Sequence, residues 1–203
     1  SEMCIRDSFL VHGFPREVRA HLRSVGVSVL LFFGSMLGAG LTVVFAPEVI
    51  YHLVDQEQVS HMDAMYDPEA DRIGRDRDAG DDMQMFGFYI RNNTGIGFQT
   101  FAGGLLFGLG TMFFLLFNGL HIGAIAGHLT ASGFGEPFWS FVSGHSAFEL
   151  TAIVLSGAAG LELGWALVSP GQKTRARALI EAARRVIGLV YGAALLFFLA
   201  AFV

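Results

Sequence analysis

Polar residues spaced one helical turn apart interrupt an otherwise apolar sequence. His145 and Glu149 are four residues apart, which places both on one face of a helix. Asn118 and His121 also share a helical face, and His128 lies two turns beyond His121. Imidazole and carboxylate groups can exchange protons or bind metals. Because polar groups inside a bilayer are costly, such residues must be paired, packed or functional.

The composition around these residues is that of a membrane protein. The chain has 203 residues, of which 53% are hydrophobic and only 15% are charged. This is too apolar for an ordinary soluble domain. The 26 glycines agree, since glycine is more frequent in membrane helices than in soluble ones. We therefore predict an all-α fold, a polytopic membrane helical bundle.

The apolar segments predict about five transmembrane helices in a single membrane domain over residues 25–203. A span needs about 20 mostly apolar residues. The long segment 86–131 needs a break, which the glycines at 108–110 supply. Residues 1–8 resemble neither a helix nor a signal peptide and are interpreted as a non-native remnant, with 9–24 as the N-terminal segment. The predicted spans are 25–46, 88–107, 111–131, 138–168 and 186–203.

Basic residues predict the orientation of these spans. Arginines precede the first span, and five lysines and arginines fall in the connector 169–185. With five spans both segments lie on one side, which the positive-inside rule makes cytoplasmic. We therefore expect a multi-pass protein of the bacterial inner membrane with a cytoplasmic N-terminus and an outer acidic loop at 47–86. The connector is amphipathic and is either a solvated link or a docking face for a cytoplasmic partner or anionic lipid.

Depth along the helices suggests that the polar residues form one cluster. At 1.5 Å per residue, His121 lies roughly 15 Å and Glu149 roughly 14 Å from the outer side. We predict a functional polar cluster of Asn118, His121, His145 and Glu149, with His128 nearer the outer side. It is a structural hydrogen-bond network, a proton or substrate path, or a metal site. We favour the network, and expect no metal, because a lone His-x-x-x-Glu lacks the paired histidines of zinc sites.

Further polar residues lie near the ends of the predicted spans. Arg91, Asn92 and Asn93 are placed at the outer mouth of the second span, where arginine can reach the interface and the asparagines can cap or bridge helices. These three are either structural or a functional contact. Glu162, near the inner end of the fourth span, is expected to pair with the basic connector. We expect no cofactor, and no basic-aromatic pattern indicates nucleic-acid binding.

Small residues recur at four-residue steps in three predicted spans. Such stripes let helix backbones approach closely, which drives helix association in lipid. We expect them to pack helices within the chain, and an interface between two copies in a homodimer is the alternative. They are Gly34 and Gly38 in the first span, Gly119, Gly123 and Gly127 in the third, and Ser156, Gly160 and Gly164 in the fourth.

Several of these motifs together resemble the stage II sporulation protein M family. The resemblance covers about residues 14–203. It rests on Asn118-Gly119, on His145-x-x-x-Glu149-Leu150, and on the Gly-Ala-Ala-Gly that ends at Gly160. The family usually has proline before this histidine and glycine after it, where this chain has Gly144 and Ser146.

The resemblance implies a membrane protein that is not itself an enzyme. In spore formers the named member helps to localise cell-wall-remodelling proteins, and relatives in other bacteria often have genes near those of MoxR-type ATPases. We therefore expect a scaffold in the cell envelope, with such proteins as partners. The alternative is a small permease or permease subunit that uses the His/Glu/Asn cluster as a proton or ligand relay. An intramembrane hydrolase ranks last, because no nucleophile or metal pattern appears.

Overall fold

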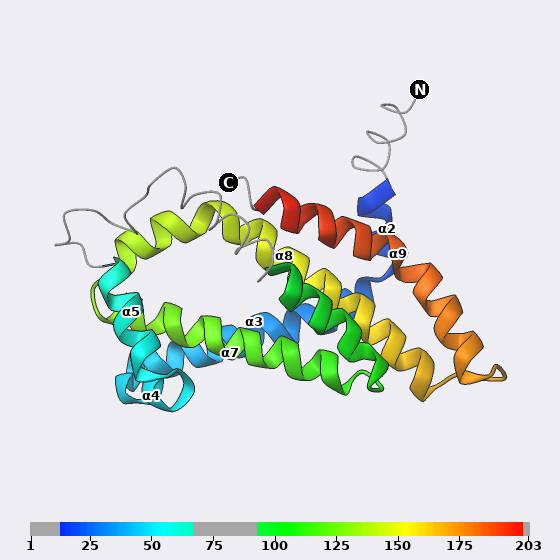
Figure 1. Cartoon of the computed structure of the whole chain (residues 1–203), viewed down its shortest axis with the longest axis horizontal. Helices are drawn as coiled ribbons and strands as arrows, with labels where there is room; N and C mark the ends of the chain where they lie inside the picture. The colour runs from blue at the N-terminus through cyan, green and yellow to red at the C-terminus, as the bar shows by residue number, and fades with distance from the viewer. Residues whose placement is uncertain (1–12, 67–92, 201–203) are drawn as a thin grey trace, which may run out of the picture.

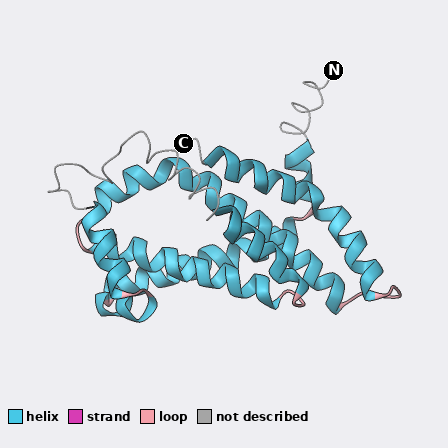
Figure 2. Ribbon diagram, in the orientation of Figure 1, coloured by secondary structure: helices cyan, strands magenta, loops and turns pink. Residues whose placement is uncertain are grey.

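The computed structural model describes residues 13–66 and 93–200, except the side chains of residues 137 and 141–145. Helices make up the fold, and this described part contains no strand (Figure 2). Four helices are long and apolar enough to cross a membrane, which confirms an all-α bundle of membrane-spanning character. They are α3 (Leu22–Phe45), α7 (Leu109–Ala131), α8 (Gly135–Val168, apolar from Ser146) and α9 (Arg175–Ala200). They coincide with four of the five predicted spans.

The remaining predicted span, 88–107, is described only from residue 93. A helix over 93–102 continues into the short helix η3 (Gly103–Leu105), and a tight turn then leads into α7. Gly108 has a φ of 84°, a left-handed conformation that glycine adopts without steric cost. The predicted break at 108–110 is therefore a turn at 106–108, and α7 begins one residue later.

The helices pair across a common core (Figure 1). α3 runs alongside α7, and α9 lies on α8, while α8 also contacts α3, α7 and η3. The side chains of Phe32, Leu115, Ile153 and Leu189 are fully buried where these elements meet. Many other large apolar side chains stay exposed, as expected for helices that face lipid.

The predicted basic connector is mostly helical. Residues 175–185 are continuous with the following span, and together they form the single helix α9. The reason is local, because this stretch is rich in alanine, arginine, leucine and glutamate, which favour helices. In Figure 1, α9 starts at one end of the molecule and bends before it runs back beside α8. The short helix α2 (Phe14–Ala20) packs against α9.

The first part of the predicted outer loop is also helical. Residues 47–66 form η2 (Pro47–Val49), α4 (Ile50–Leu53) and α5 (Gln56–Tyr66). α5 buries Val59 and Tyr66, and the Tyr66 ring meets the Phe138 ring edge-on at 5.3 Å. Residues 67–86 of that loop lie outside the described residues. The described part of the loop is thus an ordered cap on one end of the bundle.

Candidate functional site

The predicted polar cluster does not form a single hydrogen-bonded group among the described side chains. The Asn118 amide donates to the Phe114 carbonyl of its own helix at 2.7 Å. His121 accepts a hydrogen bond from Gln58 of α5. Glu149 is half-buried on α8 and has no hydrogen bond to a described residue. The side chain of His145 lies outside the described part of the chain.

Two histidines of α7 instead meet polar side chains of α5. The Gln58 amide nitrogen donates to His121 Nε2 at 3.1 Å. His128 Nε2 donates to Asp63 Oδ1 at 2.8 Å. The His128 side chain is only 12% exposed, whereas that of Asp63 is 37% exposed. We call these four residues, which hold the cap helix α5 against a membrane-spanning helix, the outer junction, after the side on which the sequence predicts this end to lie.

Sequence reasoning did not find Gln58 and Asp63. Both lie in a segment whose acidic and polar composition resembles that of a solvated loop. A signal was present, because Val59, Met62 and Tyr66 are spaced three and four residues apart, which marks one apolar face of a short helix. The polar residues beside this face are then placed to contact α7.

A second polar group joins three helices near the opposite end. His21, between α2 and α3, places Nδ1 3.3 Å from Glu162 Oε1 of α8 and Nε2 3.3 Å from the Arg185 carbonyl oxygen of α9. The Ser24 hydroxyl donates to the same Glu162 oxygen. A neutral imidazole can donate to one of its two acceptors, and an imidazolium to both. We call His21, Ser24 and Glu162 the inner junction, again after the predicted orientation.

The inner junction corrects one prediction. Glu162 was expected to pair with the basic connector, but its described partners are His21 and Ser24. In the connector, Lys173 and Arg177 pair with Glu181 instead. His21 directly precedes α3, and its contact with a residue 141 positions away carries no local sequence signal.

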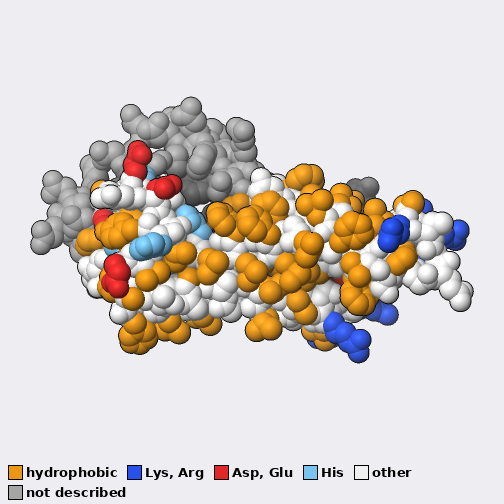
Figure 3. All heavy atoms as spheres, turned by 90° about the horizontal axis from the view of Figure 1, so that it is seen from below, with side chains coloured by type: hydrophobic (Ala, Val, Ile, Leu, Met, Phe, Trp, Pro, Cys, Tyr) orange, Lys and Arg blue, Asp and Glu red, His pale blue; other side chains and the backbone are white. Residues whose placement is uncertain are grey.

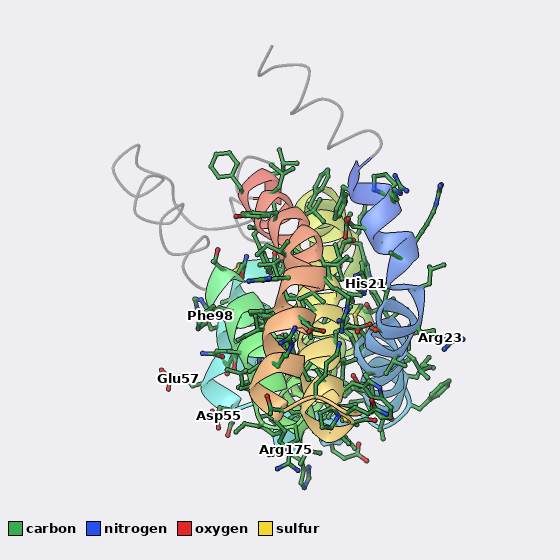
Figure 4. All side chains as sticks on the ribbon, turned by 90° about the vertical axis from the view of Figure 1, so that its right-hand side faces the viewer. His21, Arg23, Asp55, Glu57, Phe98 and Arg175 are labelled. Carbon is green, nitrogen blue, oxygen red and sulfur yellow. The ribbon has the colours of Figure 1, made fainter. Side chains whose placement is uncertain are left out.

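Charges divide between the two ends of the long axis. On the face shown in Figure 3, lysines and arginines gather at one end, hydrophobic side chains cover the middle, and most of the visible acidic side chains and histidines lie at the other end. Figure 4, seen from the basic end, shows Arg175 at that end and Asp55 and Glu57 projecting from the side of the bundle. The bundle is therefore electrically asymmetric along its axis.

Glycines set the distance between α3 and α7. A Cβ added at Gly123 would lie 2.1 Å from the Met36 carbonyl oxygen, and one at Gly127 would lie 2.4 Å from the Gly40 carbonyl oxygen. At Gly119 the nearest atom would be the Ser35 hydroxyl oxygen at 2.1 Å. Since real Cβ contacts below 3.0 Å essentially never occur, this side of α7 requires glycine.

The stripe on α8 has a similar role, whereas that on α3 does not. A Cβ at Gly160 would lie 2.4 Å from the Thr111 hydroxyl oxygen, and one at Gly164 would lie 2.4 Å from the Gly108 Cα. Thr111 itself donates to the Thr100 carbonyl at 2.7 Å, which ties α7 to the helix over 93–102. Gly34 and Gly38 face outward and contact no other helix within the described structure.

The predicted outer-mouth residues are only partly described. Arg91 and Asn92 lie outside the described residues, and Asn93 begins the helix over 93–102. Among the described side chains, which leave out His145, no three from His, Cys, Asp or Glu gather as metal ligands would. Among these described side chains every fully buried nitrogen or oxygen has a hydrogen-bond partner.

The fold and the two junctions define a polytopic α-helical membrane protein whose bundle is fastened by polar contacts at both ends. The family model of stage II sporulation protein M matches residues 28–203. The chain therefore belongs to the stage II sporulation protein M family.

One curated relative is an uncharacterized protein of Methanocaldococcus jannaschii. It is 31% identical over 77 residues, which cover 36% of this chain and 42% of the relative. The match thus spans less than half of that protein's length. No solved structure matches this chain.

Proposed function

We propose that this protein is a non-enzymatic scaffold of the bacterial inner membrane, which organises cell-wall-remodelling proteins or a MoxR-type ATPase. The outer junction is the observation that supports this proposal most. It fixes the polar helix α5 on the membrane bundle by two hydrogen bonds, one of which goes to a carboxylate. The face of α5 that points away from α7 is exposed. A surface held in this way is suited to present side chains to a partner in a constant geometry.

The opposite end offers a second surface. Arg175 and Arg177 are exposed at the start of α9, and Arg16, Arg19 and Arg23 are exposed on α2 and α3. By the positive-inside rule this end faces the cytoplasm, which puts α5 on the outer side. A cytoplasmic ATPase would then meet the basic end, and wall-remodelling proteins would meet the cap.

The experiment is a cross-linking pull-down from native membranes at equal expression. It compares the wild type with Asp63→Asn, which weakens the bond from α5 to His128, and with Glu57→Gln, which removes an exposed charge from α5 but no junction bond. Recovery of wall-remodelling proteins by the wild type and by Glu57→Gln, with loss in Asp63→Asn, supports the scaffold. If none of these samples recovers an envelope protein or an ATPase, the proposal is wrong.

One observation favours a second function, that of a small permease. Glu149 lies half-buried within the apolar part of α8 and forms no hydrogen bond to a described residue. A carboxyl group in that setting can take up and release a proton during transport. If this is its role, Glu149→Gln folds normally but abolishes a solute or proton flux in liposomes. Equal flux in both proteins rejects the permease.

A further inference from the structure

An open pocket lies where α4 and α5 meet α7. Its volume is about 320 Å³. Its wall combines aromatic and polar side chains, namely Tyr51, His52, Asp55, Gln58, Phe117 and His121. Gln58 and His121 are held in place by their mutual hydrogen bond, so this part of the wall is preorganised.

One side of the pocket continues into an apolar track on α7. The Phe113 and Phe117 rings stack 5.8 Å apart at 17°, and the Phe117 and His121 rings stack 6.2 Å apart at 13°. Phe113 is 59% exposed and Phe117 is 54% exposed. Leu116 and Leu120 are also exposed on this helix. An acyl chain can therefore lie along α7 from the bilayer up to the pocket.

The charge of the pocket wall favours some lipid headgroups over others. Asp55 is exposed in the wall and supplies a carboxylate, and no lysine or arginine is among the described residues that line the pocket. The Gln58 amide nitrogen is used on His121, which leaves its carbonyl oxygen as a further acceptor. Tyr51 and Phe117 add aromatic faces, which attract cations. An acceptor-rich, negatively charged and aromatic wall fits an ammonium group and disfavours a purely anionic headgroup.

We propose that this pocket binds one phospholipid with a primary ammonium headgroup, with its acyl chain on the track of Phe113 and Phe117. The ammonium donates to Asp55 and lies beside the aromatic rings, and His52 is the nearby donor for the phosphate. A primary ammonium suits the site better than a quaternary one, because it can donate hydrogen bonds to the carboxylate.

The test is native mass spectrometry of the full chain with equal amounts of phosphatidylethanolamine and phosphatidylglycerol. We expect the wild type to retain phosphatidylethanolamine about ten- to a hundredfold more, the range for one hydrogen bond to a charged group. Asp55→Asn should bring this ratio close to one. Glu57→Gln is the matched control, because Glu57 is an exposed acid two residues away that does not line the pocket.

Three results would overturn the proposal. One is equal or greater retention of phosphatidylglycerol by the wild type. Another is that Asp55→Asn and Glu57→Gln retain the two lipids in the same ratio, when circular dichroism shows that both variants are folded. The third is that soluble glycerophosphoethanolamine displaces the bound lipid at the same concentration as added phosphatidylethanolamine does. The acyl track would then contribute nothing to binding. A soluble amine, such as that of a peptide, would in that case be the ligand.

Discussion

Replacing Gly123 by alanine tests the close backbone contact between α7 and α3. The new Cβ would lie 2.1 Å from the Met36 carbonyl oxygen, whereas real Cβ contacts do not fall below 3.0 Å. The nearest atoms all belong to the backbone of α3, so no side chain can rotate away. The two helices must therefore separate locally by about 0.9 Å, which is the difference between these two distances.

Gly38→Ala is the matched control for this change. Gly38 lies on α3 with nothing within 4 Å of an added Cβ. Both substitutions gain the same helix propensity, about 1 kcal/mol, so this gain cancels when the two variants are compared. The remaining difference is the cost of overpacking, which is typically about 1–3 kcal/mol.

The assay is unfolding of both variants by sodium dodecyl sulfate in mixed micelles, followed by circular dichroism. We expect the free energy of unfolding of Gly123→Ala to fall below that of Gly38→Ala by about 1–3 kcal/mol. Equal stability of the two variants would refute the reasoning, since α3 and α7 would then not be in backbone contact at this point.

Three further outcomes follow from the two junctions and from Gly160. Asp63→Asn should weaken the docking of α5 by about 1 kcal/mol, seen as faster hydrogen exchange over 56–66, while exchange in Glu57→Gln stays at the wild-type rate. Glu162→Ala should lower the free energy of unfolding by about 1–2 kcal/mol, because it removes the shared acceptor of His21 and Ser24. An unchanged midpoint of unfolding by sodium dodecyl sulfate contradicts the inner junction. Gly160→Ala should be less stable than Gly38→Ala by about 1–3 kcal/mol, since its Cβ would lie 2.9 Å from the Thr100 carbonyl oxygen. Equal stability of these two variants would show that the helix over 93–102 does not pack there.

The sequence was sufficient to predict four apolar helices, because hydropathy and length are local properties; the fifth predicted span, 88–107, is described only from residue 93. The four apolar helices follow the predicted segments to within a few residues, apart from the earlier start of α9. Spacing of small residues was also informative, since Gly119, Gly123 and Gly127 lie where α7 meets α3. The same spacing did not separate these from Gly34 and Gly38, which face outward. A stripe of small residues shows that another helix can approach closely at that face. Whether one does depends on which helices lie beside it in the fold.

The partners of polar residues could not be read from spacing within one helix. His121 and Glu149 were matched by depth, yet His121 bonds to Gln58 of the cap. Depth fixes the level of a residue along the bundle, but not the direction in which its side chain points. The cap itself was missed because it was grouped with the rest of the acidic loop 47–86, although its apolar residues show helical spacing. Long-range contacts such as that of His21 with Glu162 depend on the tertiary fold.

The measurement that tests the scaffold most directly is site-specific photo-cross-linking in native membranes. A photoreactive amino acid is placed at Glu57 on the cap, at Arg177 on the basic end, and at the exposed Leu30 on α3 as a lipid-facing control. The scaffold predicts protein adducts with wall-remodelling proteins at Glu57 or with an ATPase at Arg177, and none of these at Leu30. The yield of the Glu57 adduct should fall when Asp63→Asn is added. Identical adduct patterns at all three positions would contradict the scaffold.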